Sequence, residues 1–255
     1  MSLREVHYIQ LAFTLGWQDV KQSYRRSSLG PFWLTLGMAV QVLALGLVFG
    51  LIFESPLDEF LPFIGTSLIL WGFINSSVLD GSMTFISSEA ILRQLPVPHY
   101  VHVLRSVWKN LLMLMHNIVI LPVVFLVFLK SPNWNILLFL PGFLVVSAFL
   151  ISATYFLAFL TTRFRDMQQI IASIMTVVFY VTPIIWQPSL IPGGTAHLLL
   201  GLNPFYHFLQ IIRLPILGQA PTFENWALAT VITVLTGLVA YLTSKKFKNR
   251  LVYWV

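Results

Sequence analysis

The sequence contains no cysteine and few charged residues. The lack of cysteine excludes disulfides and any zinc, iron-sulfur or thiol chemistry that depends on this residue. Asp, Glu, Lys and Arg make up 9% of the 255 residues, whereas an ordinary soluble domain carries about 25%. With 57% hydrophobic residues, a soluble globule of this size would leave large apolar patches facing water. The composition therefore predicts that the outer surface of this protein contacts lipid.

The charged residues are separated by long uncharged segments. A helix needs roughly 20 apolar residues to cross about 30 Å of hydrocarbon, and six segments are long enough. We predict transmembrane helices at residues 32–53, 62–84, 108–129, 136–160, 168–187 and 225–244. These segments do not alternate in polarity, which excludes a transmembrane barrel. The predicted fold is an all-α integral membrane protein with a single transmembrane domain at residues 1–255.

The distribution of positive charge predicts the orientation of these helices. Short cytoplasmic loops are enriched in Lys and Arg, and with the N-terminus inside, every Lys and Arg except Lys130 and Arg213 lies on the cytoplasmic side. Both termini are then cytoplasmic, in a multi-pass protein of the bacterial inner membrane. The positive net charge is explained by topology, and it does not indicate a nucleic-acid partner, for which a basic face on a soluble fold is expected.

The N-terminal segment, residues 1–28, is amphipathic. Its apolar residues recur every three or four positions, as in a helix; they are Val6, Ile9, Phe13, Trp17, Val20 and Tyr24. This pattern is typical of a helix that lies in the headgroup layer. Two interpretations remain open: a membrane-surface anchor, or a collar that also contacts a cytoplasmic partner.

Two connecting segments have distinct patterns. Residues 88–102 carry Glu89 and Arg93 four positions apart and then Pro96 and Pro98, which predicts a short cytoplasmic helix followed by a rigid turn. This segment is either a simple connection or a docking element. Residues 188–224 are longer than an ordinary loop, yet their apolar pieces are too short to span. We expect them to re-enter the membrane where protein shields their backbone.

Four short motifs carry a resemblance to a known family. They lie in order along the chain, at Tyr24–Trp33, Ile91–Pro98, Arg163–Asp166 and Asn203–Phe205 with Arg213. Together with six predicted spans, they resemble the membrane permease subunit of bacterial ABC exporters for surface polysaccharides. That family moves O-antigen, capsule and teichoic acid chains, and its members have the type-2 ABC exporter fold.

The resemblance implies a mechanism. Two permease copies form a channel, and two copies of a separate ABC ATPase dock below and drive an undecaprenyl-linked polysaccharide, here O-antigen, across the membrane. The sequence lacks a G-x-x-x-x-G-K-[ST] phosphate loop, so ATP and Mg are expected on the partner subunit and no cofactor on this chain. Two alternatives remain: an exporter for a drug or small lipid, and a membrane enzyme acting on lipid-linked sugars.

A sugar chain requires aromatic and hydroxyl groups that do not hold any unit tightly. Such residues recur on single helix faces, and the channel-lining candidates are Gln41, Ser67, Trp71, Asn75, Ser173, Thr176, Phe179, Tyr180, Trp186 and Gln187. Polar rows of this kind also serve as hydrogen bonds between packed helices, and Trp186 near a span end also fits an interfacial belt.

The resemblance also implies coupling and lipid contacts. Glu89, Arg93, Pro96 and Pro98 are the candidates for ATPase coupling. Arg163 and Arg165 are the candidates for binding the pyrophosphate of the lipid linker, because guanidinium suits phosphate geometry, although positive-inside topology explains the same two residues.

Two further ionisable residues lie in or near apolar segments. Asp80 is expected to pair with Arg163 or Arg165 or to act in gating, and Arg213 is expected to contact headgroups or Glu224. His99 and His102 lack a third ligand at metal spacing, and no catalytic or metal site is predicted.

Overall fold

The computed structural model describes residues 3–23, 30, 32–131, 133–188 and 200–255. The described residues form helices and connecting turns without a strand, so the predicted all-α fold is confirmed. The helices are α1 (Leu3–Ser23), α2 (Phe32–Ile52), α3 (Leu57–Ser82), α4 (Thr84–Ser87), α5 (Glu89–Gln94), α6 (His99–Asn117), α7 (Ile120–Val127), the 3-10 helix η1 (Trp134–Leu138), α8 (Phe139–Arg163), α9 (Met167–Val181), α11 (Pro204–Ile216), α12 (Phe223–Phe247) and α13 (Leu251–Trp254).

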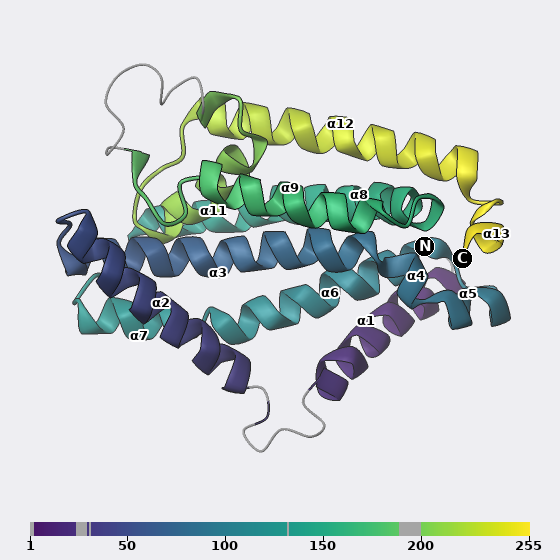
Figure 1. The fold of residues 1–255 in the computed structure, drawn as a ribbon, viewed down its shortest axis with the longest axis horizontal. Helices are drawn as coiled ribbons and strands as arrows, with labels where there is room; N and C mark the ends of the chain where they lie inside the picture. Colours follow the sequence, from purple (N-terminus) through teal and green to yellow (C-terminus); the bar gives the residue numbers. More distant parts are fainter. Residues whose placement is uncertain (1–2, 24–29, 31, 132, 189–199) are drawn as a thin grey trace.

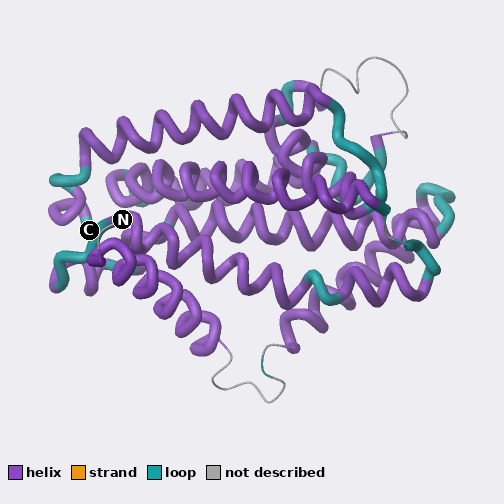
Figure 2. The backbone as a smooth tube through the Cα atoms, turned by 180° about the vertical axis from the view of Figure 1, so that it is seen from behind, coloured by secondary structure: helices purple, strands orange, loops and turns teal. Residues whose placement is uncertain are grey.

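The long helices form an elongated bundle around α3, and both ends of the chain lie at the same end of it (Figure 1). Every residue of α3 from 60 to 71 is buried, and α2, α6, α8, α9 and α11 all pack against this helix. Seen from behind, α12 lies along the outer edge of the bundle (Figure 2), where it packs on α8 and α11. α3 is thus the central helix of the subunit.

Among the described residues, five helical segments are long and apolar enough to cross a membrane. They are Phe32–Ile52, Leu57–Ser82, His99–Val127, Trp134–Arg163 and Phe223–Phe247. The predicted span at 168–187 corresponds to α9, which has 15 residues and ends at Val181. Its end has a local cause, because the residue before a proline is disfavoured in a helix; Thr182, before Pro183, is extended with ψ of 136°.

Two other predicted spans differ in their bounds. α3 begins at Leu57 rather than 62, and its first turn holds Asp58 and Glu59, acidic residues that favour a helix N-terminus. α6 begins at His99, nine residues before the predicted start of the span. This helix is interrupted before α7 because Pro122 has no N–H for the carbonyl of Ile118, which instead accepts a 3.0 Å hydrogen bond from the Leu121 N–H.

The remaining helices differ less from the predicted segments. α2 ends one residue before the predicted bound. η1 and α8 together extend the predicted segment 136–160 by two residues at its start and three at its end, and α12 extends 225–244 by the same amounts. The described part of the predicted amphipathic segment forms α1, which packs on α6. Within the expected re-entrant segment 188–224, residues 189–199 lie outside the described residues.

A small apolar cluster closes the end of the bundle that holds both ends of the chain. It contains Phe85, Leu92, Val103, Phe159 and Leu251, all buried. These residues come from α4, α5, α6, α8 and α13. The cluster therefore fixes the short helices α4, α5 and α13 to the ends of the long ones.

Candidate functional site

A row of polar side chains lies along the exposed face of α9. Ser173, Thr176 and Tyr180 are exposed, and Tyr180 is 62% accessible, whereas Ile171 and Met175 face the core. The two hydroxyl groups donate to backbone carbonyls four residues earlier, at 2.9 Å for Ser173 and 3.0 Å for Thr176. Each hydroxyl hydrogen is therefore used within the helix, while each hydroxyl oxygen can still accept a hydrogen bond from outside the subunit.

Other candidates surround this row. Phe179 is half-buried with its ring centroid 6.1 Å from that of Trp71. The Trp186 indole N–H donates to the Tyr180 carbonyl at 3.1 Å, and Gln187 is half-buried. On α2, Gln41 is exposed among apolar residues, beside the buried Val42.

The candidates on α3 lie inside the subunit or at its margin. Ser67 is buried, and its hydroxyl donates to the Phe63 carbonyl at 2.7 Å. Trp71 is buried between Phe179 and the ring of Phe205, whose centroid is 5.8 Å away. Asn75 is half-buried. The sequence-based set is therefore divided into a surface row on α9 and a packed row behind it on α3.

Arg213 is a buried side chain that forms hydrogen bonds with three separate segments. Its guanidinium donates to the Ser67 hydroxyl at 3.0 Å, the Pro183 carbonyl at 2.6 Å and the Gln210 side-chain oxygen at 2.8 Å. It also lies 4.6 Å from the ring centroid of Phe63. The side chain joins α3, α11 and the turn after α9.

The expected contacts of Arg213 with headgroups or Glu224 are wrong for this structure. The residue is 1% exposed, and no carboxylate in the described part of the chain forms an ion pair with it. Its helix α11 is buried over most of its length because it packs on α3, α8 and α12. A sequence signal existed in Gln210, three residues earlier on the same helix face.

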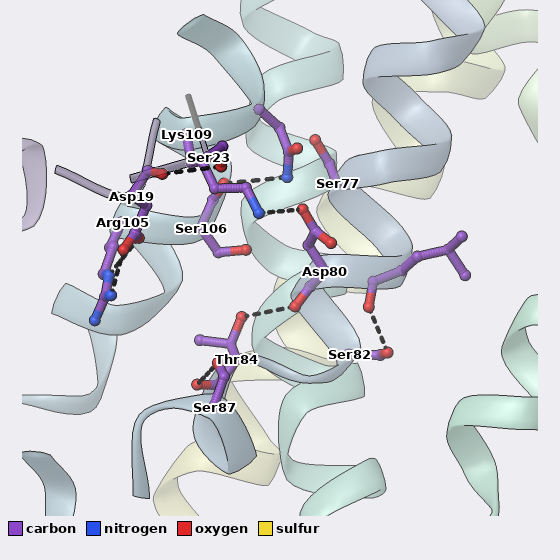
Figure 3. A network of polar contacts seen from close by, with 12 residues as sticks. Asp19, Ser23, Ser77, Asp80, Ser82, Thr84, Ser87, Arg105, Ser106 and Lys109 are labelled. Carbon is purple, nitrogen blue, oxygen red and sulfur yellow. Dashed lines mark hydrogen bonds and ion pairs between the residues drawn. The ribbon is translucent and has the colours of Figure 1, made fainter. Parts of the chain in front are cut away.

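Two ion pairs connect α1, α3 and α6 (Figure 3). Asp19 accepts two hydrogen bonds of 2.6 Å from the Arg105 guanidinium, and the Lys109 ammonium lies 2.7 Å from the Asp80 carboxylate. The expected pairing of Asp80 with Arg163 or Arg165 is therefore wrong, because Lys109 on the neighbouring helix is its partner. Arg105 and Lys109 lie four residues apart, so one face of α6 joins both α1 and α3.

A polar pocket of about 410 Å³ lies between these three helices and α4. His102 lines it, is 1% exposed, and has both ring nitrogens without a hydrogen-bond partner among the described residues. The two basic side chains that line this pocket are already paired, Arg105 with Asp19 and Lys109 with Asp80. The pocket thus has balanced charge.

The coupling candidates form a compact segment beside the chain's last residues. Glu89 and Arg93 form a 2.9 Å ion pair on α5, and Arg93 also donates to the backbone carbonyl of Val255. Pro96 is exposed, and Pro98 precedes the first residue of α6. α5 therefore presents a charged, accessible surface whose inner side is fixed by the buried Leu92.

The two arginines after α8 lie at the same end of the molecule. The guanidinium of Arg163 lies 5.5 Å from the ring centroids of both Phe164 and Trp254. Arg165 donates to the Trp254 carbonyl at 3.4 Å. Both side chains are exposed, and neither forms an ion pair with a carboxylate in the described residues.

Five membrane-length helical segments among the described residues, with polar rows on α9 and α3 and a charged cluster at one end, indicate a multi-pass membrane protein. The chain belongs to the ABC-2 type transporter family, whose sequence model matches residues 10–217. It is 28% identical over 204 residues to the O-antigen export system permease protein RfbA of Myxococcus xanthus, which covers 79% of this chain and 78% of that protein. It is 24% identical over 240 residues to a protein of the same name from Klebsiella pneumoniae, covering 92% and 90%.

These findings confirm the resemblance drawn from the short motifs. The chain is a permease-type membrane subunit of an ABC transporter, a family that works with a separate ATPase. The family assignment does not depend on the individual polar residues described above, whose roles are proposals.

Proposed function

We propose that this chain is the channel-forming permease of an ABC transporter that exports a lipid-linked polysaccharide, with O-antigen as the cargo. Support comes from its family and from the names of the relatives in Myxococcus xanthus and Klebsiella pneumoniae. Two copies assemble with two copies of an ABC ATPase, which holds ATP and Mg. The lipid carrier is undecaprenyl pyrophosphate, and Arg163 and Arg165 contact its phosphate groups.

The observation that carries the channel proposal is the exposed row of Ser173, Thr176 and Tyr180. A row of polar groups on a membrane helix is more stable against protein or water than against lipid. Hydroxyl and aromatic groups also suit a sugar chain that must slide without tight binding. We therefore assign this row, with Gln41, Asn75, Phe179, Trp186 and Gln187, to the channel wall between two copies, and Ser67 and Trp71 to the layer supporting it.

The proposed topology has six crossings, with α9 and the residues that follow it making the fifth. Both ends of the chain face the cytoplasm, which agrees with the basic residues at the ends of α8 and α12. α1 lies along the cytoplasmic membrane surface, where its exposed Phe13 and Trp17 meet the headgroup region. α11 belongs to a re-entrant segment, and its burial against three helices provides the shielding that such a segment requires.

Coupling to the ATPase is assigned to α1 and to the segment from Glu89 to Pro98. Exchanging the two charges, Glu89→Arg with Arg93→Glu, retains an ion pair within α5 but reverses the charges that a partner meets. We expect this double variant to lose most co-purification of the ATPase subunit and most ATP-driven export. Quantitative pull-down from membranes measures the first effect.

The matched control exchanges the exposed pair Asp58 and Lys130, whose charged groups lie 3.0 Å apart. Asp58 is in the first turn of α3, and the first turn of this helix lies at the end of the bundle away from α5 (Figure 1). This control should assemble normally. Unchanged assembly and export in the Glu89/Arg93 variant would refute the coupling assignment.

The function itself is tested by deleting the gene in its host. We expect surface polysaccharide to disappear while lipid-linked glycan accumulates in the cytoplasm, and the wild-type gene to restore the surface polymer. A gene with Ser173, Thr176 and Tyr180 all changed to leucine should restore little. A control with leucine at Ile170, Ile174 and Val177, apolar exposed positions on the same helix, should restore export.

The other outcomes separate the alternatives. An unchanged surface coat after deletion favours an exporter for a drug or small lipid. Loss of polymer without a retained lipid-linked pool favours a biosynthetic membrane enzyme. Full restoration by the triple leucine variant at the polar row would refute its assignment to the channel wall.

A further inference from the structure

A second pocket, of about 350 Å³, lies where α8 and α12 end against α13. Its walls are mostly aromatic and aliphatic and include Phe156, Leu160, Phe247 and Trp254. Two arginines, Arg163 and Arg250, also line it. The pocket is therefore amphiphilic, with an apolar interior and two cations.

The cations in this pocket have no anionic partner. Neither Arg163 nor Arg250 forms an ion pair with a carboxylate within the ranges that the structure describes. The Arg163 guanidinium instead lies 5.5 Å from the ring centroids of both Phe164 and Trp254. The aromatic contacts fix the position of the guanidinium and leave its N–H groups available.

The polar pocket between α1, α3 and α6 provides a comparison. There Arg105 and Lys109 are neutralised by Asp19 and Asp80, and most lining residues are polar. A ligand at that site would have to break an ion pair to meet a cation. The pocket at α13 offers free cations beside apolar walls, so the two sites differ in the ligand they suit.

The position in the bundle indicates the depth of the second pocket. α8 and α12 belong to membrane-length segments, and both end at this pocket, at Arg163 and Phe247. The ends of membrane helices lie near the headgroup layer. A ligand there can place an anionic head in the polar layer and a chain in the apolar one.

We propose that this pocket binds the phosphate group of a lipid. Arg163 and Arg250 bind the phosphate oxygens, and Phe156, Leu160, Phe247 and Trp254 contact the first carbons of the chain. Two sources have this chemistry: the isoprenoid pyrophosphate of the exported glycan and an anionic membrane phospholipid. The proposal deepens the proposed function for the first source, and it stands without that function for the second.

The test uses the purified full-length permease and two probes, undecaprenyl pyrophosphate and phosphatidylglycerol. Native mass spectrometry measures retention of each probe across a concentration series. The double variant Arg163→Gln/Arg250→Gln is expected to weaken binding of at least one probe by about tenfold or more, since a hydrogen bond to a charged group contributes about that factor. The control Lys245→Gln/Lys248→Gln removes the same charge from exposed positions outside the pocket, and its binding should match wild type.

The two probes distinguish the sources. A loss for undecaprenyl pyrophosphate alone assigns the pocket to the carrier of the cargo, and a loss that includes phosphatidylglycerol assigns it to membrane phospholipid. Wild-type affinity of the double variant for both probes overturns the proposal. If the double variant does not fold, as judged by its melting curve, Arg250→Gln alone replaces it, because no hydrogen bond or ion pair of that side chain is found in the described residues.

Failure of the pocket and failure of the transport function give different results. Wild-type probe binding in the double variant, together with a retained glycan pool after gene deletion, refutes the pocket and leaves the export function intact. Weakened phosphatidylglycerol binding with an unchanged surface coat supports the pocket and refutes polysaccharide export.

Discussion

Changing Gly142 to alanine is expected to destabilise the subunit by about 3 kcal/mol. A Cβ atom at this position of α8 would lie 2.3 Å from the backbone oxygen of Ile211 and 3.0 Å from its carbonyl carbon. Because the obstructing atoms belong to the backbone of α11, no side-chain rotation relieves the overlap. α11 would have to move away from α8, together with the contacts that Arg213 makes on the same helix.

The measurement is thermal unfolding of the purified protein in detergent. A loss of about 3 kcal/mol corresponds to a decrease in Tm of about 6 °C or more. Gly37→Ala on α2 is the matched control, because a Cβ there meets no atom within 4 Å, and it should leave Tm unchanged or raise it slightly. Equal Tm values for the two variants would show that α8 and α11 separate freely.

Changing Arg213 to lysine is expected to cost about 2–4 kcal/mol. The guanidinium reaches three acceptors on separate segments, namely Ser67, Pro183 and Gln210. A lysine ammonium keeps the buried charge but cannot bridge these acceptors with a planar fork. The variant retains the desolvation cost of a cation and leaves buried acceptors without donors.

Arg213→Met separates the charge from the hydrogen bonds. Methionine also leaves the three acceptors without a donor, but it removes the buried cation. We therefore expect the methionine variant to be less destabilised than the lysine variant. Detergent unfolding curves of both variants, with Lys245→Met as a surface control, give this ranking. A lysine variant as stable as wild type would contradict the account of Arg213 as a hydrogen-bonded hub.

The helices on the outside of the bundle were the most predictable from the sequence. α2, α8 and α12 expose long apolar faces, so they form uncharged segments of membrane length, and their bounds lie within three residues of the predicted ones. The family resemblance was likewise readable from short motifs, since the match to the ABC-2 type transporter family agrees with it. These features depend on local composition, which a single sequence contains.

Uncharged segments did not predict the bounds of helices whose ends form ion pairs. α6 includes Arg105, which lies before the predicted span, and Lys109, which lies at its start; their charges are neutralised by Asp19 and Asp80 on other helices. α3 also starts before the predicted bound, in a turn whose Asp58 pairs with Lys130 from beyond α7. A pairing between distant segments is not visible in local sequence.

The residue types of the candidate site were predictable from the sequence, but the burial of each side chain was not. The periodic spacing of Ser173, Thr176 and Tyr180 correctly grouped them on one face of α9. The same reasoning grouped Ser67 and Trp71 on α3 without revealing that they are buried. Whether a polar row faces outward or inward depends on which helices pack on it. Ser67 on α3 accepts a hydrogen bond from Arg213 on α11, a residue more than 100 positions away in the sequence.

The attachment of α1 has a consequence for the cooperativity of the fold. α1 packs mainly on one helix, α6, through a face that includes Ala12, Gly16 and Val20 and through the hydrogen bonds that Arg105 donates to Asp19, whereas α3 is enclosed on nearly every side. We therefore expect separation of α1 from α6 to require less free energy than global unfolding, with the rest of the bundle intact. A protein that binds α1 only when it is packed on α6 would stabilise this packing, and with it the face of α6 whose Lys109 pairs with Asp80 of α3.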